Sequence, residues 1–292
     1  GVGDAVATAA LAAGHTVRAL VRDTTRVAPR PGLTLVEGDA RVPADLQAAM
    51  EGSEVVLHAL NLPYPDWDPG MIELTRAVLV AAERAGATVL FPGNVYNFGG
   101  DFSRPLTEDA SRDCPSRKGA IRNRLEAMLD EAPVQTVVLR MGDFFGGIGE
   151  STWMYHLTSG TRTGGAIQYP AARDIPHAWT FLPDAAKTLV ILAERRAELP
   201  AHASFNFAGH VVEGDRFVAA VRAALGDPDR RTKGFPWMWM HLARPFVPMV
   251  RELFEMRYLW EQPVRMDGGR LQAFLGDVPH TPYEQAVAEA LA

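Results

Sequence analysis

The chain of 292 residues has little of several features that mark specialised classes of protein. Its one cysteine, Cys114, rules out a disulfide within the chain and favours the reducing cytoplasm as its compartment. No basic-then-apolar leader opens the sequence, so secretion is not expected. The most apolar stretch, 234–249, contains prolines and Arg244, which exclude a membrane span there.

Neither sign of charge forms a dominant patch in the sequence. The formal net charge is -6, and acidic and basic residues are interspersed, which leaves no extended basic face for DNA or RNA. No metal site is expected. The composition, with 47% hydrophobic and 22% charged residues, is that of a globular protein with one large domain or two unequal ones.

Helix-like and strand-like patterns alternate through the first half of the sequence. Helical patterns at 4–13, 44–50, 70–85 and 118–130 separate apolar strand-like runs at 15–21, 33–37, 54–60, 88–92 and 136–141. This alternation predicts an α/β fold with a parallel sheet covered by helices on both faces. Ligands of such sheets bind at the carboxyl ends of the strands.

The first residues, Gly1-Val-Gly3, lie directly before a helical pattern. In a dinucleotide-binding fold, glycines between the first strand and its helix let backbone amides hold the pyrophosphate. Gly1 and Gly3 are candidates for that role, although a lone Gly-x-Gly is most often a plain turn. No strand precedes them, so we expect that the sequence lacks the first strand of the sheet.

The residues that close the strand at 15–21 bear on the choice of cofactor. An acidic residue about 20 positions after the glycines binds the ribose 2′-hydroxyl of NAD, whereas an arginine suits the 2′-phosphate of NADP. Arg22 lies directly at the strand end and favours NADP, with NAD as the alternative. A surface pair of Arg22 with Asp23 that binds no ligand is the competing interpretation.

The strand at 88–92 and the helix start at 115–122 carry the most informative pattern. The strand ends in a turn that contains Asn94, and the helix places Lys118 and Arg122 one turn apart on one face. This layout resembles the extended short-chain dehydrogenase/reductase family, which includes epimerases and dehydratases. In that family a strand-end Ser or Thr faces a Tyr-x-x-x-Lys turn. Asn94, Lys118 and Arg122 stand at or beside the Ser/Thr, Tyr and Lys positions.

The resemblance covers nearly the whole chain. Residues 139–146 are similar to the family's Leu-Arg strand and Asn-x-x-Gly region, with Asp143 in place of Asn. Residues 177–184 and 205–209 are similar to its later His-x-x-Asp and Tyr-Asn-x-Gly segments. The resemblance implies a Rossmann-type doubly wound, NAD(P)-binding domain in residues 1–150 and a smaller substrate lobe in 151–292. A segment at about 178–208 is expected to return to the first domain.

The resemblance also implies which residues bind the cofactor. Gly38-Asp39-Ala40 corresponds to the family's adenine corner, with an Asx turn as the alternative. The end of the strand at 54–60 corresponds to the segment that passes the nicotinamide. The cofactor residues implied in this way are Asp39, Ala40, Ala59, Leu60, Asn61, Pro92, Gly93, Lys118 and Arg122.

The family's Tyr exchanges a proton with the carbinol oxygen while hydride moves, so a chain without that Tyr needs another acid. Lys118 is the candidate, because burial and the like charge of Arg122 would favour its neutral form. Arg122 can only bind, Asn94 can polarise a carbonyl, and Tyr96 offers a second hydroxyl. The alternative is a solvated basic helix start in which Glu126 pairs with Arg122.

Aromatic side chains are expected to line a mostly apolar substrate pocket. The candidates are Tyr64, Trp67, Phe144, Trp153, His177 and Trp179. Local packing of the loop aromatics and a buried, hydrogen-bonded role for His177 are the alternatives. The glycine-containing stretch 151–169 is expected to form a flexible cover, and His58, within a strand, is interpreted as a core histidine.

The stretch 234–249 is richer in aromatic residues and methionine than the sequence before it. We expect it to pack internally or against another subunit in a homodimer, with peripheral membrane contact as a third option. Together these features predict an NAD(P)-binding oxidoreductase that acts on a small, hydrophobic carbonyl or alcohol substrate. A dinucleotide-sensing regulatory protein without turnover, and a non-redox isomerase, epimerase or lyase, are the alternatives.

Overall fold

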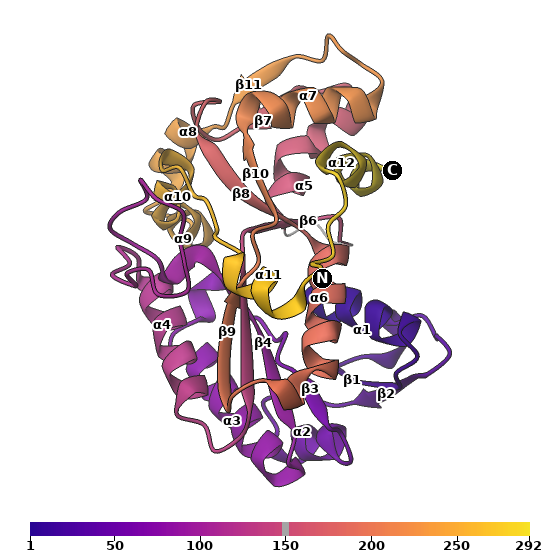
Figure 1. The fold of residues 1–292 in the computed structure, drawn as a ribbon. Coiled ribbons are helices and arrows are strands. Elements are labelled where there is room, and N and C mark those ends of the chain that lie inside the picture. The colour runs from indigo at the N-terminus through magenta and orange to yellow at the C-terminus, as the bar shows by residue number, and fades with distance from the viewer. Residues whose placement is uncertain (148–151) are drawn as a thin grey trace.

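The structure is a computed structural model that describes residues 1–147 and 152–292 (Figure 1). The helices are α1 (Val2–Ala12), α2 (Pro43–Met50), α3 (Gly70–Ala85), α4 (Arg117–Asp130), α5 (Trp153–Thr158), α6 (Leu182–Glu194), α7 (Gly214–Leu225), α8 (Trp237–Ala243), α9 (Pro248–Glu255), α10 (Tyr258–Glu261), α11 (Gly269–Leu275) and α12 (Tyr283–Leu291). The strands are β1 (Val17–Val21), β2 (Leu33–Glu37), β3 (Val55–Leu57), β4 (Thr88–Asn94), β5 (Thr136–Met141), β6 (Asp143–Phe145), β7 (Ile167–Tyr169), β8 (Pro176–Phe181), β9 (His202–Asn206), β10 (His210–Glu213) and β11 (Thr232–Gly234). The expected domain boundary at residues 150 and 151 lies outside the described residues.

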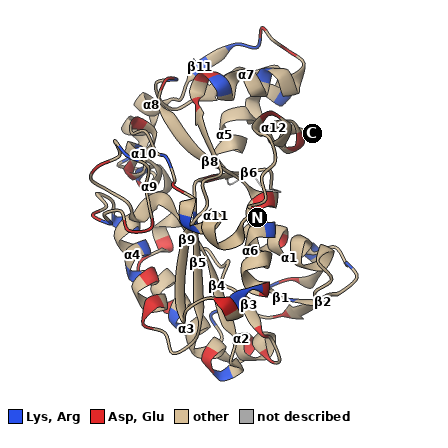
Figure 2. Ribbon diagram, in the orientation of Figure 1, with Lys and Arg blue, Asp and Glu red and all other residues tan. Residues whose placement is uncertain are grey.

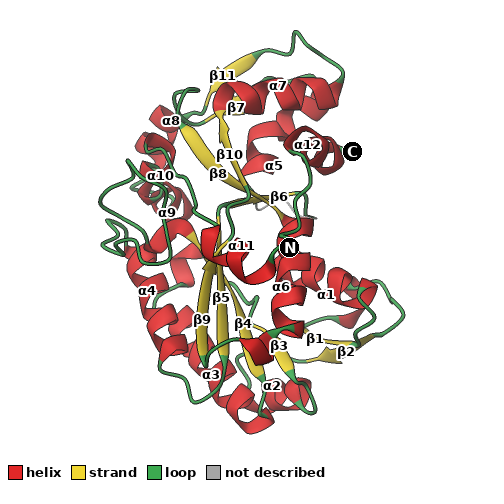
Figure 3. Cartoon of the chain, in the orientation of Figure 1, coloured by secondary structure: helices red, strands yellow, loops and turns green. Residues whose placement is uncertain are grey.

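Two parallel sheets with helices on both faces form the larger part of the molecule (Figure 3). The larger sheet has the strand order β3-β4-β5-β9, and the smaller one pairs β1 with β2. Alternate residues of β4 point to opposite faces, so Val89 and Phe91 pack with α3 and α4 while Leu90 packs with α1 and α6. This arrangement confirms the expected doubly wound α/β fold.

The strands of the larger sheet differ in how well they are covered. Every residue of β5 is buried, as expected for a central parallel strand with an uninterrupted apolar run. The three residues of β3 are only partly buried, and in the described ranges β3 pairs with β4 but not with β1. The strand that we expected before Gly1 stays a prediction.

A smaller lobe is built on two further sheets. Strand β8 pairs antiparallel with β10 and parallel with β6, and β7 pairs with β11. Helices α5, α7 and α12 enclose an apolar cluster with these strands. The chain then returns to the first unit, because α6 packs on α1 and β9 extends the larger sheet beside β5.

The stretch that we expected to be a flexible cover belongs to the core of the lobe. Ser151 lies outside the described residues, but Met154, Leu157 and Ile167 are all buried. Helix α5, a 3-10 turn at Ser159–Thr163 and β7 account for most of the stretch. The glycines misled the sequence prediction, because Gly164 ends a 3-10 turn with a positive φ of 80° rather than marking a mobile loop.

Candidate functional site

Tyr96 is fixed where β4 ends, at the edge where ligands bind in a parallel sheet. The carboxamide Oδ1 of Asn94 accepts a hydrogen bond from the backbone N of Tyr96 at 3.0 Å and so caps a 3-10 turn, Val95–Asn97. This turn touches α4 at Gly119, where an added Cβ would lie 2.2 Å from the backbone oxygen of Tyr96. Only glycine at that position allows the turn and the helix to approach this closely.

Tyr96 forms a phenol pair with Tyr64, which follows β3 in a separate 3-10 turn. The two hydroxyl oxygens are 2.9 Å apart. Burial, followed by the neighbouring tyrosine and the charge of Asp143, raises the pKa of Tyr96 well above its usual value. Burial also raises the pKa of Tyr64, while the charge of Arg122 opposes the rise at both residues. Both phenols are therefore protonated at neutral pH, so the pair can donate a proton.

Arg122 lies beside this phenol pair on the first turns of α4. Its guanidinium carbon is 4.9 Å from the ring centre of Trp67 and 5.4 Å from that of Phe91, within cation–π range. Nη1 donates to the backbone oxygen of Pro92 at 3.4 Å, and Nε is buried without a hydrogen-bond partner among the described residues. Burial lowers the pKa of Arg122 from the usual arginine value. A half-buried cation with an unused donor faces the end of β4.

Glu126 is occupied elsewhere, so the alternative that it pairs with Arg122 is wrong. Its carboxylate accepts from Arg140 Nε at 3.0 Å and Nη2 at 2.6 Å, and from Asn97 Nδ2 at 2.6 Å. Arg112 approaches the same carboxylate at 3.2 Å. Glu126 therefore joins α4 to β5 and to the turn that carries Tyr96.

Lys118 is buried under α9 rather than facing an open site. Its Nζ donates to Glu252, in a very short contact, and to Glu255 Oε2 at 2.8 Å. Burial alone would raise the pKa of Glu252, but the hydrogen bond and charge of Lys118, with Arg117, hold it below the usual value. The expectation that the like charge of Arg122 sets the state of Lys118 is corrected, because two carboxylates neutralise this ammonium.

Asp143 and His177 approach the phenol pair from the lobe. His177 Nε2 lies 2.7 Å from Asp143 Oδ2, and the imidazole stacks on Trp260 with ring centres 3.7 Å apart. Asp143 lies two residues after Met141, which pairs with Asn94 at the end of β4, and its charge contributes to the raised pKa of both tyrosines. Tyr64, Tyr96, Arg122, Asp143 and His177 are called the polar cluster below.

Two of the expected pocket residues do not present surface to a pocket. Trp67 is 1% exposed and donates from Nε1 to the backbone oxygen of Leu62, and Trp179 is completely buried in the core of the lobe. Trp153 is half-buried against Trp237 and Trp260. Phe144 is half-buried against the core beside α6. Local packing explains these positions.

His58 lies in the core and is not a member of the polar cluster. It is buried, and its Nε2 lies 2.9 Å from Thr75 Oγ1. Burial, followed by the charge of Arg122, lowers the pKa of His58 to about 3, so the imidazole is neutral. This agrees with its interpretation as a core histidine.

The residues expected to bind the pyrophosphate and nicotinamide lie around the start of α1. Gly1 and Gly3 are exposed, and a Cβ on Gly3 would lie 3.7 Å from that of Ala59, which places the start of α1 against the segment after β3. Asn61 is exposed, Leu60 is half-buried, and Gly93 packs against Arg140. The role of these residues in binding a cofactor stays a prediction.

The expected adenine end lies at the ends of β1 and β2. Arg22 is exposed, and Asp23 accepts from the backbone N of Thr25 at 3.0 Å instead of pairing with Arg22. Arg41, which the sequence analysis missed, donates from Nε to both carboxylate oxygens of Asp39 at 3.0 Å. Hydrogen bonds from Arg41 lower the pKa of Asp39 to about 2, and the charge of Arg22 contributes. Two arginines therefore lie near this edge, with Ala40 partly buried beside them.

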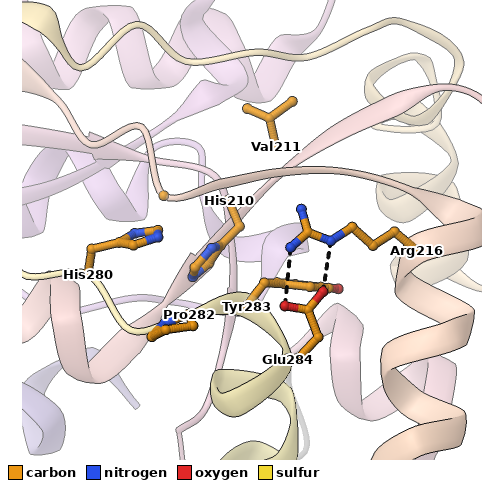
Figure 4. A pocket seen from close by; sticks show the side chains of 8 residues that line it. His210, Val211, Arg216, His280, Pro282, Tyr283 and Glu284 are labelled. Carbon is orange, nitrogen blue, oxygen red and sulfur yellow. Dashed lines mark hydrogen bonds and ion pairs between the residues drawn. The ribbon is translucent and has the colours of Figure 1, made fainter.

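A cavity of about 400 Å³ lies in the lobe, apart from the polar cluster (Figure 4). His210 and His280 lie next to each other in its lining, with ring centres 4.7 Å apart, and Arg216 donates to Glu284 at 2.9 and 3.2 Å. Burial, followed by the charge of His280, lowers the pKa of His210 to about 4. Within the described ranges no group of three side chains is arranged to hold a metal ion. No pattern in the sequence indicated this cavity.

Comparisons with known proteins agree with the geometry of the first unit. Residues 1–144 match a family model described as NAD(P)H-binding. No curated protein matches the chain. Residues 1–144 therefore match an NAD(P)H-binding family, and their fold is of the Rossmann type that the resemblance implied.

Solved structures extend the likeness to the lobe. The WbmH enzyme of Bordetella bronchiseptica, in complex with NAD+, superposes with a TM-score of 0.77 at 17% identity, covering 100% of this chain and 93% of that chain. UDP-N-acetylglucosamine 4-epimerase from Bacillus cereus gives 0.77 at 15% identity, with 99% and 91% covered. MoeE5, in complex with UDP-glucose and NAD, gives 0.74 at 18% identity, with 99% and 94% covered. At these identities the likeness shows the fold alone, over nearly the whole length of the chain.

Proposed function

We propose that the chain is an NADP-dependent oxidoreductase that reduces the carbonyl group of a small, hydrophobic substrate at the polar cluster. The observation that carries this proposal is the neutral phenol pair of Tyr64 and Tyr96 at the carboxyl end of β4. A tyrosine in this position can replace the hydroxyl that the helix lacks at Lys118. The bound nicotinamide would supply the hydride.

The proton would come from the phenol pair. Tyr64 is half-buried and Tyr96 is buried, so Tyr64 is placed on the substrate side and Tyr96 behind it. As hydride reaches the carbonyl carbon, Tyr64 gives its proton to the carbonyl oxygen, and Tyr96 gives its own proton to Tyr64. The charge of Arg122, which opposes the raised pKa of both tyrosines, stabilises the phenolate left behind.

Lys118 has a positioning role in this proposal. Its ammonium is neutralised by Glu252 and Glu255, and its Nζ lies 5.1 Å from the ring centre of Tyr64. It fastens α9 to α4 beside the tyrosine that meets the substrate. A lysine held by two carboxylates is a weaker candidate for the acid than a neutral phenol.

The cofactor is proposed to be NADP rather than NAD. Arg22 and Arg41 both lie near the edge where the resemblance places the adenine ribose, and guanidinium groups suit the 2′-phosphate. WbmH and MoeE5 were solved with NAD, so NAD binding is the competing outcome.

Calorimetric titration of NADPH and NADH, followed by a screen of hydrophobic aldehydes and ketones for NADPH oxidation, tests the proposal. Tight NADPH binding with turnover that Tyr64→Phe slows by about 10²- to 10⁴-fold is expected. Turnover at an undiminished rate in that variant would remove the phenol pair from the reaction.

A second candidate function is a dinucleotide-sensing protein without turnover. The closed state of Lys118 and the burial of Tyr96 favour it, because neither group is open to a substrate in this structure. Binding of NADPH without oxidation across the carbonyl screen, together with a change in protease sensitivity of α9 on binding, would favour the sensor. A non-redox epimerase, which the names of the solved neighbours suggest, would convert a UDP-sugar without net NADPH loss.

A further inference from the structure

Helix α8 and the loop that follows it expose an unusual amount of apolar surface. Met238, Trp239 and Phe246 are 76%, 73% and 84% exposed. The apolar tip is defined by Met238, Trp239, Leu242, Phe246, Val247 and Met249. The other large exposed hydrophobic residues in the described ranges are Val42, Val80 and Val211, at 44%, 43% and 39%. A concentration of this kind marks a docking surface, so only part of this stretch packs internally as expected.

One side of α8 contacts α9, which fixes which side of α8 faces outward. Trp237 and His241, one turn apart, contact Phe254 with ring centres 5.9 and 5.5 Å away. Arg244 continues this side, with its guanidinium carbon 5.3 Å from the same ring. With this side held by α9, Met238, Trp239 and Leu242 are left to point outward.

The segment that carries the apolar tip is basic, and the first carboxylate after it, Glu252, is 3% exposed. Segment 231–251 contains Arg231, Lys233, Arg244 and Arg251 and no aspartate or glutamate, in a chain with a formal net charge of -6. All four cations are exposed, although Arg251 also contacts Glu252 at 3.4 Å. Helix α8 itself carries no charged residue (Figure 2). An apolar surface rimmed by cations is complementary to an anionic lipid interface.

We propose that the apolar tip docks this protein on the surface of an anionic membrane. In the described residues no helix is both long and apolar enough to cross a bilayer, so the tip would lie in the interface plane. A second copy of the chain fits less well, because a two-fold contact through this surface would bring the same cations of both copies together. Docking does not depend on the proposed reaction.

The proposal is tested by flotation of the full chain with vesicles of phosphatidylcholine, with and without phosphatidylglycerol. The protein floats with the anionic vesicles, less with the neutral ones, and less as salt rises. The double variant Trp239→Ser/Phe246→Ser lowers the bound fraction by about tenfold or more, since it removes two exposed apolar groups. The matched control Val80→Ser/Val211→Ser, also at exposed sites, leaves binding unchanged.

Two double variants that remove positive charges separate the electrostatic component of binding from the apolar one. Lys233→Gln/Arg244→Gln reduces binding to anionic vesicles only, whereas Arg76→Gln/Arg84→Gln, exposed on α3, does not. If a tip variant unfolds, the quenching of tryptophan fluorescence by brominated lipid is compared between the wild-type protein and Trp239→Phe. Stronger quenching of the wild-type protein supports contact of Trp239 with lipid, and equal quenching of the two proteins contradicts it. Absence of flotation by the wild-type chain overturns the proposal. The proposal is also overturned if light scattering shows a concentration-dependent dimer that the tip variant abolishes, while vesicles bind neither protein.

Discussion

Removing the carboxylate of Glu126 is expected to destabilise the fold far more than removing a surface carboxylate. Glu126 and Arg140 are each 1% exposed, and Arg140 donates to the carboxylate from two nitrogens. Glu126→Leu would leave Arg140 as a buried, unpaired cation, which costs about 3–5 kcal/mol. The partly exposed Arg112 can turn to water, so its lost contact adds about 0–1 kcal/mol.

Urea unfolding followed by circular dichroism measures this loss. A change of about 3–5 kcal/mol would be a large part of the stability of an ordinary domain. The control is Glu198→Leu, which breaks an exposed pair with Arg195 and should change the stability far less. The double variant Glu126→Leu/Arg140→Met should be more stable than Glu126→Leu, because it no longer buries a lone charge. A Glu126→Leu cost equal to that of the surface control would refute the reasoning.

Three further predictions concern the cofactor, the proton donor and pH. Arg22→Gln should weaken NADPH binding about tenfold or more by calorimetry with little change for NADH, and equal losses would reject the phosphate contact. Tyr96→Phe should lower kcat with a smaller change in KM, because Tyr96 lies behind Tyr64 and away from the substrate. His58 has a folded pKa of about 3 against about 6.5 unfolded, so the unfolded state binds the proton first as pH falls. Between about pH 6.5 and about pH 3, His58 should therefore lower the stability by up to about 1.4 kcal/mol per pH unit, so the fall should be less steep in His58→Gln but not in the exposed control His15→Gln.

The regular elements of the first unit were predictable because their signals are local. The strand at 33–37, the helix at 70–85 and the strand at 136–141 have the expected bounds. Each is an apolar run or an amphipathic pattern closed by its own end signal, such as Gly86, which ends α3 with a φ of 65°. Such signals need no knowledge of distant residues.

The chemistry of the candidate site was less predictable because it depends on long-range contacts. Nothing near Lys118 in sequence indicates that Glu252 and Glu255, more than 130 residues later, neutralise it. The pairing of Tyr64 with Tyr96 spans 32 residues and two separate turns. Composition showed that 234–249 is apolar, but only the packing of α8 on Phe254 shows which side of that stretch faces outward.

Helix α9 connects the polar cluster with the apolar tip. It begins at Pro248, directly after Phe246 and Val247 of the tip, and its far end supplies Glu252 and Glu255 to Lys118. It also packs against the 3-10 turn that carries Tyr64. Tyr64 therefore lies beside a helix that is held by a buried ion pair at Lys118 and that begins next to an exposed apolar surface. Since Glu252 is 3% exposed, any movement of α9 away from α4 would have to separate or solvate that ion pair, which is costly.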